Sequence, residues 1–254
     1  QGDGNVFLGG ATEGDLAGFT GSSNTVLGVG AGLTNNGSLN TFIGVNAGRT
    51  NSEGDSNTFI GTNAGQSNET ANNNVFIGTD AGSENSNGET NVFIGTSAGA
   101  SNVNGNRNVY LGNSAGRQAS GNDNVILGTF AGSNNSGDSN VYLGVLTGGT
   151  ASGSNNVFLG TNTGFQKSGN LNVFVGNNVC SSDIDGNESV AIGTLIDNVG
   201  SQCTIVGTNS SSSNNDNSTT VGYNTSTDGP NSTAVGHKAF SSTDRSEERR
   251  VGKE

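Results

Sequence analysis

A five-residue motif recurs along the whole chain, and it constrains the fold more than any other feature. The motif is Asn, then Val or Thr, then Phe or Tyr, then Ile or Leu, then Gly, with close variants. Its glycine is position 0 of each repeat, which places Asn at −4 and the aromatic residue at −2. Successive motif glycines are 19 residues apart, then 16 or 17, and 14 or 15 after Gly193. The fifteen motif glycines are Gly9, Gly28, Gly44, Gly61, Gly78, Gly95, Gly112, Gly128, Gly144, Gly160, Gly176, Gly193, Gly207, Gly222 and Gly236.

Repeats of this length and composition predict a parallel β-solenoid. Each unit concentrates its β-branched and aromatic residues in one short run, has no helical periodicity and is too short for a helical hairpin. One short strand per unit, with each unit stacked on the previous one, gives parallel coils about 4.8 Å apart. We therefore expect an all-β fold, a parallel β-roll of about 15 coils of 14–17 residues.

The overall composition excludes several other classes of protein. The chain has 44 Gly, one Pro, no Trp and 12% charged residues, which argues against a conventional globular core. Glycine has no period of three, so collagen is excluded, and no apolar run approaches the ~18 residues of a membrane-spanning helix. The net charge of −12 makes nucleic acid and anionic lipid poor partners, so we expect neither nucleic-acid binding nor membrane contact within this segment.

Strand alternation assigns the motif positions to two faces. Positions −3 and −1 share one face and position −2 lies on the other. We expect −3 and −1 to fill the coil interior, together with the small residue at +3, such as Ala98. The Asn residues at −4 should form a ladder of amides, and Gly at +4, such as Gly99, should supply a corner with positive φ. The predicted coil core comprises Val75, Ile77, Val92, Ile94, Val109, Leu111, Val125, Leu127, Val190 and Ile192.

The aromatic column at −2 is the feature that bears most on assembly. On the outside of the coil it would form an apolar stripe larger than monomers usually expose. A strand that is apolar on both faces is typically buried on both, so we expect this column to pack against copies of the same chain. The alternative is a wider coil that encloses the rings and leaves Val or Ile covered by the polar segment. The predicted oligomer interface comprises Phe42, Phe59, Phe76, Phe93, Tyr110, Tyr142, Phe158 and Phe174.

Three C-terminal repeats, residues 188–193, 217–222 and 231–239, resemble the Asn-Ser-Val-Ala-Ile-Gly repeats of YadA-like trimeric autotransporter adhesin heads. The resemblance implies a left-handed parallel β-roll in a homotrimer on a bacterial surface, binding host matrix or other surfaces. It also implies that Val190 and Ile192 lie in the coil core and that Ala191 faces the trimer axis. The earlier repeats are similar in logic but longer, with Phe or Tyr where that family has Ala. Similar arrays occur in phage-tail and other fibre proteins.

The spacing divides the chain into two repeat regions and a tail. Residues 1–180 carry coils of 16–17 residues, and residues 181–243 carry coils of 14–15 residues. Residues 244–254 break the pattern and resemble a translated sequencing adaptor, so we expect them to be non-native. We expect the natural chain to extend beyond this segment.

Residues that could support chemistry are few, and we expect no catalytic, cofactor or metal site. His237 is the only histidine and is interpreted as a solvated turn residue. Residues 60–65 fit one hexapeptide unit of left-handed β-helix acyltransferases, but those enzymes need three consecutive units per coil. Asp183 and Asp185 could hold Ca²⁺ weakly, although a solvated loop pair explains them as well.

The two cysteines, Cys180 and Cys203, occupy different phases of the repeat. They lie more than one coil apart, beyond the roughly 7 Å Cα separation that a disulfide allows. We expect two unpaired thiols.

Ice binding is the strongest alternative to adhesion, because it needs a regular, flat Thr face. One row of Thr follows the motif glycines, but Val45, Asn113 and Val145 interrupt it. The row consists of Thr62, Thr79, Thr96, Thr129 and Thr161.

The pattern as a whole indicates a structural, adhesive segment of a bacterial cell-surface or fibre protein. We expect a homotrimer at the cell surface or on a phage particle, whose loops make multivalent contacts with a host matrix protein, a glycan or an abiotic surface. A phage tail-fibre shaft is a second hypothesis. A glycan-active β-helix enzyme is a third, and it would require converging carboxylates.

Overall fold

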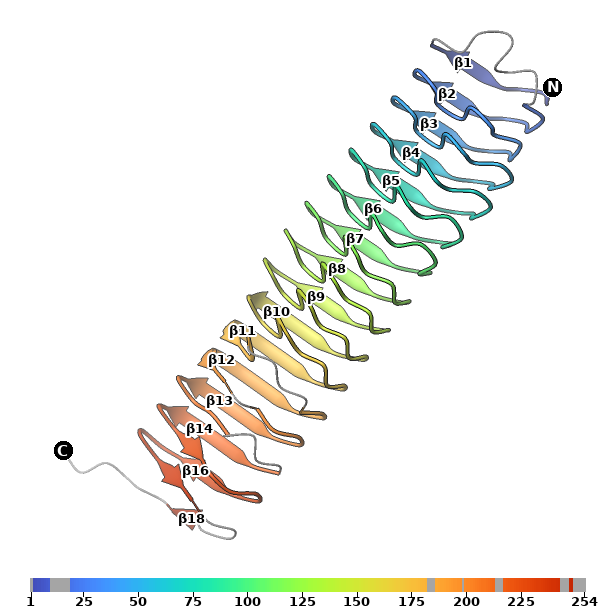
Figure 1. Cartoon of the computed structure of the whole chain (residues 1–254). Coiled ribbons are helices and arrows are strands. Elements are labelled where there is room, and N and C mark those ends of the chain that lie inside the picture. Colours follow the sequence, from blue (N-terminus) through green and yellow to red (C-terminus); the bar gives the residue numbers. More distant parts are fainter. Residues whose placement is uncertain are drawn as a thin grey trace. The chain divides into compact units, whose positions relative to one another are not determined.

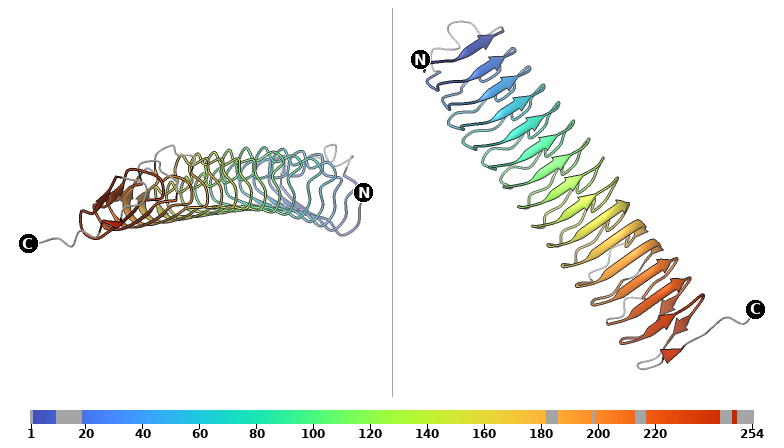
Figure 2. Two further views of the ribbon diagram at one scale, coloured as in Figure 1. Left: turned by 90° about the horizontal axis from the view of Figure 1, so that it is seen from below. Right: turned by 180° about the vertical axis from the view of Figure 1, so that it is seen from behind.

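The computed structural model describes residues 2–9, 19–181, 186–197, 199–212, 217–242 and 247–248. Within these ranges the protein is all β, has no helix, and forms a parallel β-solenoid of about 14 turns, which confirms the predicted fold class. The chain divides into two compact units, Gln1–Asn134 and Asn135–Glu254. Figures 1 and 2 show the stacked coils of each unit.

The first unit contains eight three-residue strands that pair in sequence order, all parallel. Each strand covers positions −3 to −1, and identical positions are in register, as in Val75 opposite Val92 and Phe76 opposite Phe93. The strands are β1 (Val6–Leu8), β2 (Thr25–Leu27), β3 (Thr41–Ile43), β4 (Thr58–Ile60), β5 (Val75–Ile77), β6 (Val92–Ile94), β7 (Val109–Leu111) and β8 (Val125–Leu127).

In the second unit the strands lengthen and a small second sheet is added. The main sheet contains β9 (Val141–Leu143), β10 (Val157–Thr161), β11 (Val173–Val179), β12 (Val190–Ile196), β13 (Thr204–Thr208), β14 (Thr219–Tyr223), β16 (Thr233–Val235) and β18 (Glu247–Glu248). The second sheet pairs β15 (Ser226–Thr227) with β17 (Phe240–Ser241). Strand lengthening begins at β10, ahead of the change in repeat spacing near residue 180. Most of the 244–254 tail lies outside the described residues; Glu247–Glu248 pair with β16.

The motif glycine is required by close stacking of the backbone. Gly78 has φ of +133°, and a Cβ added there would lie 2.6 Å from the carbonyl oxygen of Gly95 in the next coil. Backbone atoms cannot move aside as a flexible side chain could. Position 0 therefore excludes side chains, which explains its constancy along the sequence.

Two corners of each coil adopt the left-handed conformation, and most of these corner residues are not glycine. Position +2 has φ near +55°, as in Asn63 (57°) and Ser97 (55°). Position −5 is similar, as in Thr90 (60°) and Leu171 (59°). Asn tolerates this region better than β-branched or bulky residues do, so several coils carry local backbone strain.

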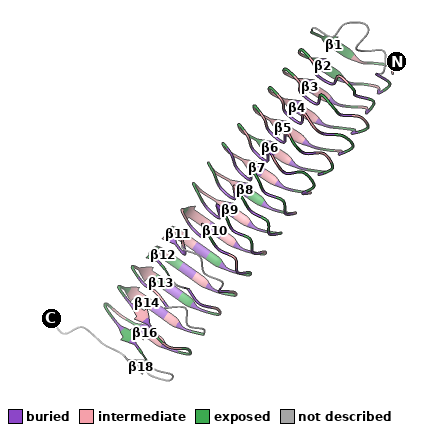
Figure 3. Ribbon diagram, in the orientation of Figure 1, coloured by how far each residue is buried: buried purple, intermediate pink, exposed green. Residues whose placement is uncertain are grey.

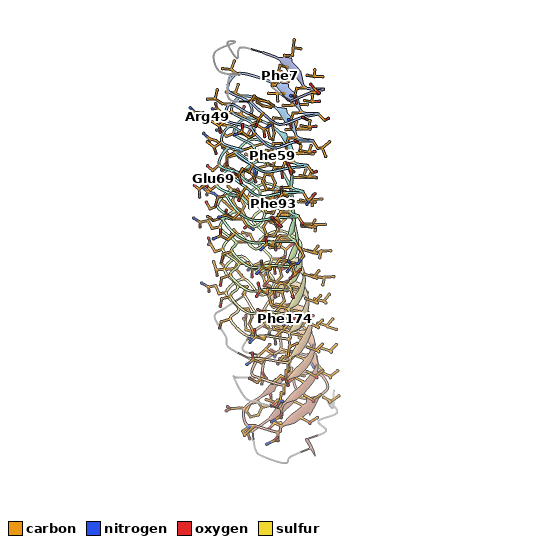
Figure 4. All side chains as sticks on the ribbon, turned by 90° about the vertical axis from the view of Figure 1, so that its right-hand side faces the viewer. Phe7, Arg49, Phe59, Glu69, Phe93 and Phe174 are labelled. Atoms are coloured by element: carbon orange, nitrogen blue, oxygen red, sulfur yellow. The ribbon has the colours of Figure 1, made fainter. Side chains whose placement is uncertain are left out.

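The aromatic column at −2 lies inside the coil. Phe93 and its counterparts are fully buried, and neighbouring rings stack in parallel, with centroids 4.8 Å apart between Phe76 and Phe93 and 4.7 Å between Phe93 and Tyr110. Figure 4 shows Phe59 and Phe93 between the sheet and the opposite loops, where Arg49 and Glu69 lie. The interior also holds the +3 residues, such as Ala98.

The sequence prediction therefore assigned the two faces the wrong way round. All eight residues of the predicted oligomer interface, Phe42, Phe59, Phe76, Phe93, Tyr110, Tyr142, Phe158 and Phe174, are fully buried within a single chain. The predicted core residues lie on the outer face of the sheet: Val75, Ile77, Val92, Val109, Leu111, Leu127 and Val190 are half-buried, and Ile94, Val125 and Ile192 are exposed. Figure 3 shows this burial pattern along the strands. Ala191, expected to face a trimer axis, is buried in the coil.

The physical reason is the Asn ladder, which fixes the direction of the strand. Positions −4 and −2 lie on the same side of a strand. The Asn91 side chain must reach two backbone groups of the next coil: its Nδ2 donates to the carbonyl of Gly105 at 2.8 Å, and its Oδ1 accepts the N–H of Asn108 at 2.9 Å. Because these bonds require Asn91 to point inward, Phe93 points inward too. The predicted ladder is confirmed, although it joins side chains mainly to backbone groups.

A second buried Asn column, at position +7, had no counterpart in the prediction. Asn85 Nδ2 donates to the carbonyl of Gly88 at 2.9 Å, which closes the turn that follows. The column comprises Asn35, Asn51, Asn68, Asn85, Asn102 and Asn135, all buried. Its constant phase in the sequence is the signal that could have revealed it.

Interior volume is redistributed where the coils shorten. Gly99 sits directly against the ring of Phe93, and Gly at +4 accompanies every aromatic residue at −2 from Phe42 to Phe158. Where −2 is the small Ala191, position +3 is the large Ile196, and both are fully buried. The two positions compensate each other, as a close-packed interior requires.

Candidate binding surface

The outer face of the main sheet is the largest regular surface on each unit. We call it the sheet face and define it as the residues at positions −3, −1 and +1. In β6 these are Val92, Ile94 and Thr96, which alternate with the buried residues and so point outward. The same three columns recur in every described coil, spaced by the parallel pairing of the strands.

The sheet face is apolar and carries no formal charge. None of the fifteen repeats places Asp, Glu, Lys or Arg at −3, −1 or +1, although the chain has 21 acidic and nine basic residues. Large aliphatic side chains remain accessible there, for example Val45 at 46%, Ile192 at 42% and Val235 at 48%. Contiguous apolar surface of this kind usually marks an interaction site.

Charged residues lie on the other sides of the coil. Arg49 and Glu69 occupy the loops opposite the sheet face (Figure 4). Arg107 and Asp123 occupy equivalent −5 corners and form a two-bond ion pair, with Nε to Oδ1 at 2.6 Å. The hydrogen bond to Arg107 lowers the pKa of Asp123, and the same bond raises the pKa of Arg107. Both groups are fully solvated, so this pair contributes little to stability.

Threonine is more abundant on the sheet face than the single predicted row suggested. The +1 residues Thr62, Thr79, Thr96, Thr129 and Thr161 are all exposed, and Val45, Asn113 and Val145 interrupt them as expected. Thr25, Thr41 and Thr58 at −3 lie on the same face. Both edge columns of the face therefore contain β-branched residues.

The few residues considered for chemistry are not brought together. His237 is exposed and stacks on the ring of Tyr223, with centroids 5.4 Å apart. Asp183 and Asp185 lie outside the described residues. Within the described part of the chain, no three His, Cys, Asp or Glu residues are grouped so that they could hold a metal ion.

The two cysteines are unpaired, as predicted, and both are buried. Burial raises the pKa of the Cys180 thiol well above its usual range, and the positive charge of Lys167 opposes this shift only in part. Lys167 occupies the +7 column, is fully buried, and its Nζ lies 5.7 Å from the centroid of the Phe174 ring.

The described residues include no helix that is long and apolar enough to span a membrane. No protein-family model matches the chain, and comparison with curated proteins gives no match either.

Proposed function

We propose that this chain is a structural and adhesive segment of a bacterial surface or fibre protein, and that it self-associates through the sheet face. The observation that carries the proposal is the uninterrupted, uncharged apolar sheet face on an acidic β-solenoid. Such a face loses the least hydration when it packs against another apolar face, whereas every charged residue keeps its contact with water.

A second copy of the same chain is the partner that this surface fits best. Each copy has a net charge of −12, but the charge lies on the loops and corners, away from the sheet face. Copies that meet at their sheet faces therefore keep their negative charges apart. Three positions in each of the seven strands β2–β8 provide 21 residues, which matches the roughly 20–30 residues per partner of stable interfaces.

The proposed assembly is a homotrimer, in line with the resemblance to adhesin heads, displayed on the cell surface or on a phage fibre. The sheet faces meet at the axis and the polar loops face outward. Each loop contact with a host matrix protein, a glycan or an abiotic surface is weak, but repetition along the coil and among three chains multiplies the affinity. In this arrangement adhesion needs no catalytic residues and no cofactor.

Light scattering on a paired set of variants tests the proposal. Ile77→Lys combined with Ile94→Lys places two charges at exposed or half-buried −1 positions without disturbing the coil interior. We expect the wild-type chain to be trimeric and this variant to be monomeric with an unchanged far-ultraviolet circular dichroism spectrum. The control is Thr70→Lys combined with Asn87→Lys on the exposed loops, which should remain trimeric. A monomeric wild-type chain would contradict the proposal.

Ice binding is the second candidate, and it competes for the same face. The observation that favours it is the presence of β-branched residues, including Thr41 and Thr96, on both edge columns of a charge-free sheet. It predicts a monomer with measurable thermal hysteresis, which Thr79→Lys combined with Thr96→Lys abolishes. A trimer without hysteresis excludes it.

A further inference from the structure

The second unit contains a polar groove that has no equivalent in the described coils of the first. It has a volume of about 310 Å³ and runs across three consecutive coils, just beyond the ends of the sheet face. Its lining comes from positions +2 to +4: Leu195, Asn209 and Asn224 at +2, Ser210 and Thr225 at +3, and Asp197, Ser211 and Ser226 at +4. A single chain supplies all eight residues.

The groove results from the way the coil turns at position +2. Asn209 and Asn224 have φ of 54° and 53°, so the chain bends there and the next residue points inward. Positions +2 and +4 then form two parallel ridges. Asn209 Nδ2 donates to Asn224 Oδ1 at 2.8 Å, which orients the amides along one ridge. Backbone bridges join Asp197 to Ser211 and Ser211 to Ser226 along the other.

The first unit has the same +2 ridge but lacks the second one. Asn46 Nδ2 donates to Asn63 Oδ1 at 3.2 Å, and both residues are left-handed. Position +4 is glycine there, as at Gly48 and Gly65, so no side chain faces the amides. The groove is therefore specific to the coils in which Asp or Ser replaces glycine at +4.

The chemistry of the lining points to a ligand rich in hydroxyl groups. Amides and hydroxyls both donate and accept hydrogen bonds, and the exposed carboxylate of Asp197 accepts them. The lining contains no cation, which argues against a phosphate, sulfate or uronic acid ligand. Apolar contacts are also available, because Leu195 is half exposed and the stacked ring of Tyr223 directly precedes Asn224.

We propose that this groove binds a neutral glycan, through one or two sugar residues. A sugar ring offers hydroxyls along its edge to the amides and the carboxylate, and C–H groups on its face to Leu195 or Tyr223. The volume lies at the lower end of the range for small-molecule sites, about 300–1,000 Å³. The proposal rests on the adhesive role proposed above and names its ligand class. Binding at one groove is weak, and display on several chains strengthens it.

The test is a titration of the full chain with a panel of neutral hexoses, N-acetylhexosamines and their disaccharides, followed by saturation-transfer nuclear magnetic resonance. We expect at least one member to bind, and Asn224→Gly to weaken its binding at least tenfold. Glycine keeps the left-handed backbone at this position, so the substitution removes only the amide. The matched control is Asn63→Gly, which removes the equivalent amide in the first unit and should leave binding unchanged.

A second variant, Ser211→Tyr, fills the groove between the two ridges and should abolish binding. The glycan proposal is overturned if no sugar of the panel binds, or if Asn224→Gly and Ser211→Tyr both bind as the wild type does. Light scattering on the same samples separates the two proposals: a trimer that binds no sugar defeats only the groove, and a monomer that binds sugar defeats only the self-association.

Discussion

The ring of Phe93 packs directly on Gly99, six residues later in the same coil. A Cβ at Gly99 would lie 2.5 Å from the ring's Cδ2 atom, and the glycine itself is left-handed, with φ of +56°. The ring therefore occupies the space that any side chain at position +4 would need. This contact recurs in each aromatic coil from Phe42 to Phe158, and it determines which face of the strand is the inside.

Gly99→Ala should destabilise the protein by about 3 kcal/mol. The left-handed backbone costs an alanine about 1–2 kcal/mol, and overpacking against the ring adds about 1–3 kcal/mol. Urea unfolding followed by circular dichroism measures the loss. Adding Phe93→Leu should recover part of it by vacating the space; no recovery would show that the contact is not the cause.

Phe93→Ala and Ile94→Ala should differ sharply in their effects, although the two residues are adjacent. Phe93 is fully buried and Ile94 is 37% exposed. Truncating a buried Phe costs about 3–5 kcal/mol, whereas a substitution at a partly exposed position should cost about 1 kcal/mol or less. The free energy of unfolding must be measured below the concentration at which light scattering detects association. Equal losses would argue against the burial pattern described here.

Asn91→Ala should cost about 2–4 kcal/mol. It leaves the N–H of Asn108 and the carbonyl of Gly105 without their side-chain partner, and each buried polar group left unsatisfied costs about 1–3 kcal/mol. Hydrogen exchange at the Asn108 amide should accelerate accordingly. The exposed Asn87 provides the control, since its amide bonds only to the side chains of Ser86 and Asn104. Asn87→Ala should leave both quantities nearly unchanged.

Thr90→Asn should stabilise the protein by about 0.5–1 kcal/mol. Thr90 is an exposed β-branched residue with φ of 60°, a conformation in which Asn is several-fold enriched. Asn already occupies the equivalent corner at Asn73 and Asn155. Thermal or urea unfolding detects the gain. Thr96→Asn, at an exposed position outside the left-handed region, should bring no gain.

Stability should fall as the pH rises above about 9, in part because of Cys180. Burial raises the pKa of this thiol in the folded protein, so only the unfolded chain loses the proton near its ordinary pKa. The contribution of Cys180 is complete below that pKa and decreases above it by up to about 1.4 kcal/mol per pH unit. Cys180→Ala should flatten the pH dependence between pH 8 and 9.5. An unchanged slope in that variant would contradict the assignment.

Reactivity gives a second measurement of the same feature. The native Cys180 thiol should resist alkylation by iodoacetamide at pH 8, because it is both buried and protonated. It should react rapidly once urea unfolds the chain. Rapid alkylation in the folded state would show that the second unit opens locally around this residue.

Much of the fold could be predicted from local periodicity. The fixed phase of Gly95 and its counterparts, together with the short apolar run before each, is sufficient for a parallel β-solenoid, because no other architecture repeats every 14–17 residues with one strand. The Asn ladder and the unpaired cysteines followed from the same spacing. These features depend only on which residues recur at the same height of each coil.

The direction of the side chains could not be assigned from apolar character, because Val92, Phe93 and Ile94 are all hydrophobic and either face could have been the inside. Two sequence signals would have decided it: the parity of Asn91 with Phe93, and the pairing of an aromatic residue at −2 with glycine at +4. The prediction used neither and inverted the faces. It also overlooked Asn85 and its column, and the two ridges of the groove in the second unit.

The sequence by itself therefore determined the architecture, because a repeat with one phase can be stacked in only one register without displacing every motif glycine. Only the tertiary structure decided what is inside and what is outside. Asn91 must reach the backbone of the next coil and the ring of Phe93 must fill the space beside Gly99, so both side chains turn inward. Val92 and Ile94 are left on the surface, where they form the sheet face.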